Sequence, residues 1–276
     1  ASTALAQTHE TATRLSGPEG PGNTVQFYEP VKAPDAEAAT ESPENAVRRA
    51  GDEVSRTLID QVRQALTNNT FQLFYQPIIS LRGDDEELYE VFVRLPTESG
   101  QVLRPMDFLP AAEQVGIAGK VDRWIVLQSI KTLSAHRTRG HNTRLIINLT
   151  YNSLADKSFL PWLTVAIKAA RLPSDAVIFQ ISENDATTYL KQAREFTRGL
   201  SELHCRASLS HFGKSVNPFG TLRHLNVELV KLDGSLVENL EKDPKYKDTL
   251  SNTISSLQSL GKLTIVPMVE TATLLA

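Results

Sequence analysis

Hydrophobic and polar positions follow two different periods along this chain. Over residues 43–67 the apolar side chains recur at helical spacing, and Ser42-Pro43-Glu44 supplies an N-cap, a proline suited to the first helical position and an acid in the first turn. We expect one long helix there. From residue 71 onward, short β-branched and aromatic runs are separated by amphipathic segments, which predicts seven strands. These are residues 71–79, 88–95, 145–149, 176–181, 207–212, 227–232 and 263–268.

The order of these elements indicates the fold class. Strands that alternate with helices are typical of a parallel α/β sheet, but residues 82–87 are too short for a parallel crossover, so the first two strands should form an antiparallel hairpin. One face of the strands is uniformly apolar. The other face gathers polar residues near the strand ends, where barrel folds carry their sites: Glu90, Arg94, Asn148, Gln180, Lys231 and Glu270. We therefore expect an α/β fold, a TIM-like (β/α) barrel with an antiparallel first strand.

Composition and charge narrow the functional classes. The net charge is −3, from 29 Lys+Arg and 32 Asp+Glu, which gives no support for binding duplex nucleic acid. No apolar run approaches the roughly 20 residues of a membrane span, and the N-terminus lacks the pattern of a signal peptide. Cys205 is the one cysteine, which excludes an intrachain disulfide. These features predict a cytoplasmic protein.

The first 42 residues differ from the rest. Residues 1–50 contain seven acidic and four basic side chains, which accounts for the whole net charge, and they hold five of the fourteen prolines. This stretch is too polar to form a core of its own, so we expect residues 1–42 to be a linker that precedes a barrel over residues 43–276.

Several ordered motifs resemble the EAL domain family of bacterial cyclic di-GMP phosphodiesterases and receptors. The segment 74–79, Phe-Tyr-Gln-Pro-Ile-Ile, resembles the family's YQPI strand, and Glu90-Val-Phe-Val-Arg94 stands where the Glu-Ala-Leu-x-Arg signature belongs. Further similar segments are 108–113, 121–124, 147–150, 179–183, 230–233 and 266–270. By the same resemblance, residues 23–30 look like the end of a GGDEF domain, and the barrel would lack its last strand.

The resemblance implies two divalent metals that activate water for phosphodiester hydrolysis. The metal-binding and catalytic positions correspond to Glu90, Asn148, Gln180, Ser210, His211, Lys231 and Pro267. Four of them depart from active members, since Gln180, Ser210, His211 and Pro267 stand where the family has carboxylates. One carboxylate, one amide and a lysine are a poor site for two dications, so we expect no metal and no hydrolysis. A single-metal site formed by Glu90, Asn148 and His211 stays as an alternative.

Groups that would hold the nucleotide are retained. Arg94 offers a planar fork for a phosphate, and the resemblance makes Asp122 and Glu270 candidates to accept from guanine. Gln76 would approach a base or a phosphate. Apolar faces against the purines could come from Phe92, Leu95, Pro96, Pro110 and Met268. Together with Asn148 these form the expected ligand-binding set.

Retained binding groups beside lost catalytic groups predict a receptor without hydrolytic activity that signals through protein partners. The departures are similar to those of degenerate EAL members that regulate type IV pilus assembly (twitching motility), which implies a PilZ-domain adaptor as partner and a GGDEF-like domain in the parent chain. The alternatives are an active metal-dependent phosphodiesterase and an interaction scaffold that binds no nucleotide.

Overall fold

The computed structural model describes residues 43–81, 83, 86–238, 240 and 244–269. The expected linker and GGDEF remnant, residues 1–42, and the expected ligand-contact residue Glu270 lie outside this part. A compact unit is formed by Val47–Ala276. The expected long helix is confirmed as α1, Pro43–Asn68. Its last turns bury Ile59, Val62 and Ala65, whereas Val54 is exposed.

All seven expected strands are present. Their bounds are β1 Gln72–Ile78, β2 Glu87–Pro96, β4 Thr143–Asn148, β5 Val177–Ser182, β6 Arg206–Phe212, β7 Leu229–Leu232 and β8 Leu263–Ile265. A further strand, β3 (Val102–Leu103), pairs with β2 and was missed because two residues carry no readable period. The expected antiparallel hairpin is confirmed, since β1 pairs antiparallel with β2 and every later pair along the sheet is parallel.

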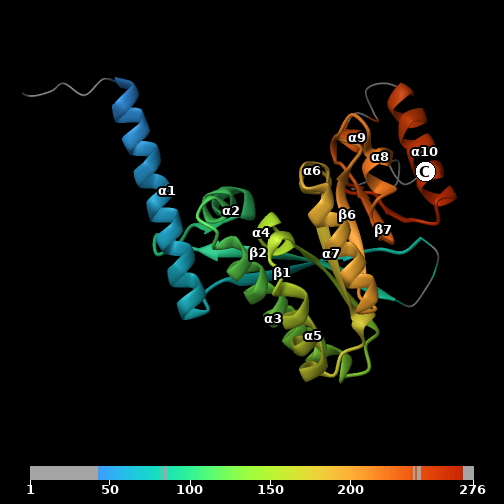
Figure 1. The fold of residues 1–276 in the computed structure, drawn as a ribbon, viewed down its shortest axis with the longest axis horizontal. Coiled ribbons are helices and arrows are strands. Elements are labelled where there is room, and N and C mark those ends of the chain that lie inside the picture. The colour runs from blue at the N-terminus through green and yellow to red at the C-terminus, as the bar shows by residue number, and fades with distance from the viewer. Residues whose placement is uncertain (1–42, 82, 84–85, 239, 241–243, 270–276) are drawn as a thin grey trace, which may run out of the picture. The chain divides into compact units, whose positions relative to one another are not determined.

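The sheet runs in the order β1-β2-β4-β5-β6-β7-β8 and curls into part of a barrel wall (Figure 1). β1 and β8 stand at its two ends, so the described residues form an open wall and not a closed barrel. The α/β, TIM-like expectation is therefore confirmed in the order and direction of the strands.

Helices follow the strands and cover the outer face of the sheet, as Figure 1 shows for α3, α5 and α7. Helix α7 illustrates why, because it buries Ala193, Phe196, Thr197 and Leu200 at spacings of three and four residues. The helices are α2 Pro105–Gln114, α3 Ala118–Arg137, α4 Tyr151–Ala155, α5 Phe159–Ala170, η1 Ser174–Ala176, α6 Glu183–Thr188, α7 Leu190–Glu202, α8 Pro218–Leu222, α9 Ser235–Glu238 and α10 Pro244–Ser259.

The core has two parts because side chains alternate across the strands. The larger cluster fills the space between helices and sheet and includes Val91, Val93 and Phe179. The smaller cluster lies on the opposite face of the sheet, inside the curl, near the amino ends of the parallel strands. It consists of Ile146, Ile178 and Leu229, with Ile78, Leu88, Leu263 and Ile265 packed against them. We call this second cluster the apolar floor.

Ile178→Ala should lower the free energy of unfolding by about 2 to 4 kcal/mol, because Ile178 is fully buried in the apolar floor and three carbons would be lost. Ile178→Val should cost only about 1 kcal/mol. Urea unfolding followed by circular dichroism measures both. Val165→Ala, which truncates an exposed side chain of α5, is the matched control and should change little. Equal, small effects of Ile178→Ala and Val165→Ala would show that the apolar floor does not contribute to stability.

Candidate functional site

A polar layer lies directly above the apolar floor. On four strands, the residue two positions after an apolar-floor side chain faces the same side of the sheet and is polar. The successions are Leu88 to Glu90, Ile146 to Asn148, Ile178 to Gln180 and Leu229 to Lys231. The layer is close to the carboxyl ends of the parallel strands, where barrel folds carry their sites.

Glu90 is the centre of this layer and is almost fully buried. Its Oε1 accepts hydrogen bonds from Asn148 Nδ2 at 3.0 Å and from Gln180 Nε2 at 2.9 Å. Its Oε2 accepts from Lys231 Nζ at 2.5 Å, which also makes an ion pair. Both carboxylate oxygens are thus occupied by donors of the protein, and the single negative charge is balanced by one ammonium group.

The amide groups complete the network. Gln180 Nε2 also donates to Asn148 Oδ1 at 2.7 Å, and Gln180 Oε1 accepts from Ser208 Oγ at 2.8 Å. The structure therefore brings together Glu90, Asn148, Gln180 and Lys231, as the sequence predicts. Ser208 was missed in the sequence, although it faces the same side as Ser210 on β6. Glu90, Gln180 and Ser208 are buried, Lys231 is half-buried and Asn148 is exposed, and a network in which every member is paired holds its side chains rigidly.

Arg94 lies near the end of β2 on the same face as Glu90. Nη1 of Arg94 donates to the carbonyl oxygen of Val93 at 2.9 Å, and the guanidinium lies 5.6 Å from the ring centre of Phe74 and 5.9 Å from that of Phe92. Among the described residues this is its one hydrogen bond, so most of the five N–H donors are left for an anion. Cation–π contacts with two rings hold the fork in place.

Strand β1 contributes to the same face. Gln76 lies opposite Glu90, and Phe74 lies opposite Phe92, in the antiparallel register. Both β1 side chains are exposed. Gln76 is therefore exposed, and Phe92 is half-buried, on the same face of the sheet as Glu90. Phe74 was not among the expected ligand-contact residues, although its alternation with Gln76 could have identified it.

Asp122 is not placed as the sequence predicts. It lies in α3 at 1% exposure, where one carboxylate oxygen accepts from Thr150 N at 2.9 Å, Thr150 Oγ1 at 2.7 Å and Ser153 Oγ at 2.6 Å. These donors belong to the first turn of α4. Burial raises the pKa of Asp122 to about 6, although the three hydrogen bonds oppose the shift. In this structure Asp122 holds α4 to α3 and is not open to a base.

Leu95 and Met268, two further expected ligand-contact residues, lie in different surroundings. Leu95 is 1% exposed and belongs to the core between sheet and helices, because it alternates with Arg94 and so faces the other side. It is a core residue here and not a contact for a purine. Pro96 follows it, half-buried, where β2 pairs with β3. Met268 is exposed and lies over Gly234, where an added Cβ would come within 2.8 Å of the Met268 sulfur.

The last residues of β6 form a second polar group with Asp233. His211 is mostly exposed, and its Nδ1 lies 3.0 Å from Asp233 Oδ2. Ser210 Oγ donates to the carbonyl oxygen of Ile181. His211 is thus paired with Asp233, while Glu90 and Asn148, the other residues of the single-metal alternative, are paired with each other in the polar layer.

A buried carboxylate that sequence reasoning missed shapes the rim of the site. Glu183 follows β5 and is 1% exposed. Its Oε2 accepts from the backbone N–H groups of Gly213, Lys214 and Ser215, at 3.0, 3.0 and 3.3 Å, and its Oε1 accepts from Ser215 Oγ at 2.6 Å. One side chain thereby fixes the loop that follows β6. Its position directly after a buried strand is the signal that could have identified it.

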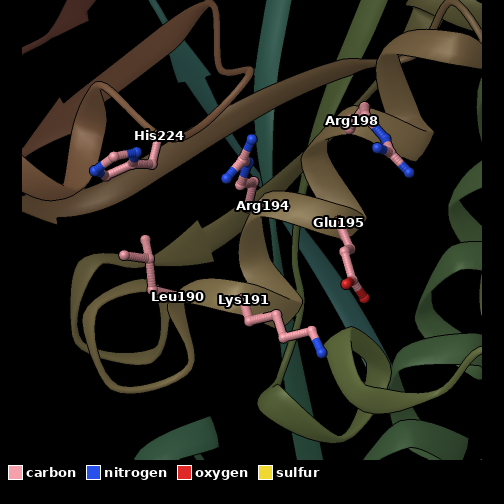
Figure 2. A pocket seen from close by; sticks show the side chains of 6 residues that line it. All are labelled: Leu190, Lys191, Arg194, Glu195, Arg198 and His224. Carbon is pink, nitrogen blue, oxygen red and sulfur yellow. The ribbon is translucent and has the colours of Figure 1, made fainter.

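A hollow of about 440 Å³ lies elsewhere, on the outer surface of α7 (Figure 2). Its lining consists of Leu190, Lys191, Arg194, Glu195, Arg198 and His224. These residues come from a helix and the segment before β7, not from the carboxyl ends of the strands. The hollow is therefore separate from the polar layer.

The order of the strands and the polar layer at their carboxyl ends agree with a comparison against known families. The model of the EAL domain matches residues 59–276. The chain belongs to the EAL domain family. In the part that the structure describes, no helix is long and apolar enough to cross a membrane.

Relatives of this EAL domain include enzymes and solved nucleotide complexes. The chain is 30% identical over 207 residues to cyclic di-GMP phosphodiesterase PdeF of Escherichia coli and 28% identical over 211 residues to phosphodiesterase PdeB of Shewanella oneidensis. It spans 27% and 25% of these two relatives and is matched over 73% and 76% of its own length.

Two solved structures are similar over most of the chain. The FimX EAL domain from Pseudomonas aeruginosa bound to c-di-GMP is 49% identical with a TM-score of 0.75, covering 79% of this chain and 88% of that one. The Xanthomonas citri FimX EAL domain in complex with c-di-GMP is 27% identical with a TM-score of 0.74, covering 82% and 88%.

The raised pKa of Asp122 predicts a pH dependence of stability. A folded-state pKa of about 6, above the ordinary 3.8, means that the folded protein binds this proton more tightly than the unfolded chain. Protonation therefore stabilises the fold, and this contribution decreases as the pH rises through 6. Between pH 5 and pH 7 the wild type should lose about 1 kcal/mol relative to Asp122→Asn.

Urea unfolding at pH 5, 6 and 7 measures this difference. Asp60→Asn, which changes an exposed carboxylate of α1, is the control and should follow the wild type at every pH. A constant difference between wild type and Asp122→Asn over the whole range would show that Asp122 does not titrate there.

Proposed function

We propose that this EAL domain binds cyclic di-GMP at the carboxyl ends of its strands and does not hydrolyse it. The observation that carries the proposal is the pairing of Glu90 with Lys231 and two amides in the polar layer. The site keeps cationic and aromatic groups suited to a dinucleotide, while Glu90, the carboxylate of its polar layer, is already paired with an ammonium group. Binding of c-di-GMP by the similar FimX EAL domains supports the first half of the proposal.

The residues present do not fit the two divalent metals that hydrolysis in this family implies. Hard cations require several carboxylate oxygens, whereas the layer offers Glu90 beside Asn148, Gln180 and Lys231. Glu90, Asn148 and Lys231 are not among the departures from active members, so the misfit lies in Gln180, whose neutral amide stands where the family has a carboxylate. Ser210, with a hydroxyl bonded to a backbone carbonyl, adds no negative charge.

The ligand chemistry matches the groups on the open face. Each of the two phosphates of cyclic di-GMP carries one negative charge, and Arg94 with its unused N–H donors is suited to a bidentate contact. Phe74 and Phe92 lie next to this guanidinium and offer flat apolar surfaces, and stacking on an aromatic ring contributes about 1 to 3 kcal/mol per base. Exposed Gln76 adds a donor and an acceptor on the same face.

Calorimetric titration with cyclic di-GMP in EDTA tests binding. The wild type should bind without metal, and Arg94→Ala should bind about 10- to 100-fold more weakly, because a charge-assisted contact to a phosphate is lost. Arg198→Ala, which removes an exposed arginine of α7 paired with Glu202, is the matched control and should bind as the wild type does.

Chromatography of the nucleotide after incubation with Mn²⁺ or Mg²⁺ completes this experiment. The nucleotide should be recovered intact. Recovery of the linear dinucleotide would instead establish an active phosphodiesterase. Absence of binding with and without metal would leave an interaction scaffold and overturn the proposal.

We further propose that the nucleotide-bound domain contacts a PilZ-domain adaptor in the control of type IV pilus assembly. Its support is the resemblance of the Glu90-Val-Phe signature and of Pro267 to the degenerate, pilus-regulating members of the family. Identity of 49% to the P. aeruginosa FimX EAL domain is in line with this grouping.

Size-exclusion chromatography of the chain with a purified PilZ-domain adaptor tests the partner. Co-elution should require cyclic di-GMP and should be reduced for Arg94→Ala at nucleotide concentrations that saturate the wild type. Separate elution of the two wild-type proteins at every nucleotide concentration would contradict the proposed partnership.

A further inference from the structure

Two histidines and a glutamate meet at the opposite end of the sheet from the polar layer. Glu87 is the first residue of β2, His136 lies in the last turn of α3, and His141 lies in the loop before β4. Their candidate ligand atoms all lie within 4.8 Å of one another. Since Glu87 and Glu90 stand at different levels of β2, this cluster is separate from the proposed nucleotide site.

The chain positions the three side chains through backbone contacts. Glu87 N donates to Asn142 O at 3.2 Å and Glu87 is paired with Thr143 in the parallel register, so β2 begins beside the α3–β4 loop. Gly140, with φ of +96°, allows this loop to turn back, and the His136 and His141 rings stack at 4.0 Å.

The distances between the candidate ligand atoms can be compared with those around a bound metal ion. Nδ1 of His141 is 3.0 Å and Nδ1 of His136 is 4.0 Å from the Glu87 carboxylate. Two ligands on one tetrahedral zinc ion, with bonds of about 2.1 Å, lie about 3.4 Å apart. His141 Nδ1 is therefore close to this separation already, whereas His136 Nδ1 would have to move by about 0.6 Å and give up its hydrogen bond with Thr143 Oγ1, 2.8 Å away. All three side chains are between 36% and 44% exposed, so an ion can reach them.

A second set of contacts orients the carboxylate and the loop. The buried Thr143 hydroxyl donates to Glu87 Oε2 at 2.5 Å, and Arg137 Nη1 donates to the Thr143 carbonyl at 2.7 Å. Hydrogen bonds from Thr143 and His141 lower the pKa of Glu87, which keeps it anionic near neutral pH. Outer partners of this kind are characteristic of metal ligands.

We propose that Glu87, His136 and His141 bind one divalent transition-metal ion of the zinc class. Two imidazoles and one carboxylate are the ligands that such ions prefer, whereas Mg²⁺ and Ca²⁺ prefer oxygen ligands. Three protein ligands leave a position for water. The bound ion would link the start of β2, the end of α3 and the start of β4, and it would act as a structural clip. This inference does not depend on the proposed function.

Titration of the metal-free chain with Zn²⁺, followed by calorimetry, tests the site. The wild type should bind one Zn²⁺ per chain, and His141→Ala and Glu87→Gln should each weaken binding at least tenfold. His224→Ala, which removes an exposed histidine far along the chain from the cluster, is the matched control and should bind normally. Glu90→Gln should also bind normally, since it alters only the polar layer.

Co²⁺ provides a second readout that surface adsorption would not reproduce. Wild type, His224→Ala and Glu90→Gln should develop the visible absorption of ordered Co²⁺, and His141→Ala should not. Circular dichroism before metal addition verifies that each variant is folded. Equal Zn²⁺ affinity in wild type, His141→Ala and Glu87→Gln would overturn the proposal, as would loss of binding in Glu90→Gln alone or no binding by the wild type.

Discussion

Alternation of side chains across a curled, mostly parallel sheet is the constraint on which the rest of this structure depends. Every second residue of a strand faces the same side, so a step of two residues along β4, β5 or β7 carries the inner face from the apolar floor to the polar layer. Because the strands are parallel, these steps fall at one level of the sheet. Five strands thereby supply one residue each to a single network that is centred on Glu90, and none of the five is adjacent to another in sequence.

The same network is the basis of the proposed receptor function. A buried carboxylate is costly unless it is paired and hydrogen-bonded, and Glu90 obtains both from Lys231, Asn148 and Gln180. The same pairing occupies both oxygens of the Glu90 carboxylate. Arg94 and the aromatic rings beside it lie at the rim and outside the hydrogen-bond network, so our proposal assigns nucleotide binding to the rim and no hydrolysis to the layer beneath it. The proposed receptor function follows from this division between a satisfied interior and an open rim.

Carboxylates outside the polar layer hold loops and helices in place. Asp122 joins α3 to the first turn of α4, and Glu183 holds three successive backbone N–H groups of the loop after β6. At the far end of the sheet, Glu87 lies beside His136 and His141, where β2 begins, α3 ends and the chain enters β4. Each of these acids is close in space to groups about 30 to 55 residues away in sequence, and each contact restrains a loop or a helix against the sheet.

The sequence by itself determined the order of the strands and the antiparallel pairing of the first two, because these follow from local period and from connection length. Local period also determined the two faces of β2 and placed Glu90, Asn148, Gln180 and Lys231 on one face of the sheet. The sequence could not show which acidic side chains are free to accept from a ligand and which already accept hydrogen bonds from neighbouring residues. Asp122 has the residue type of a guanine acceptor, yet packing of α3 against α4 buries it; Leu95 adjoins Arg94, yet the pleat turns it into the core. Only the tertiary structure places Phe74 beside Arg94, Ser208 beside Gln180, and Glu87 beside His136 and His141, since these contacts depend on register and on how the loops return.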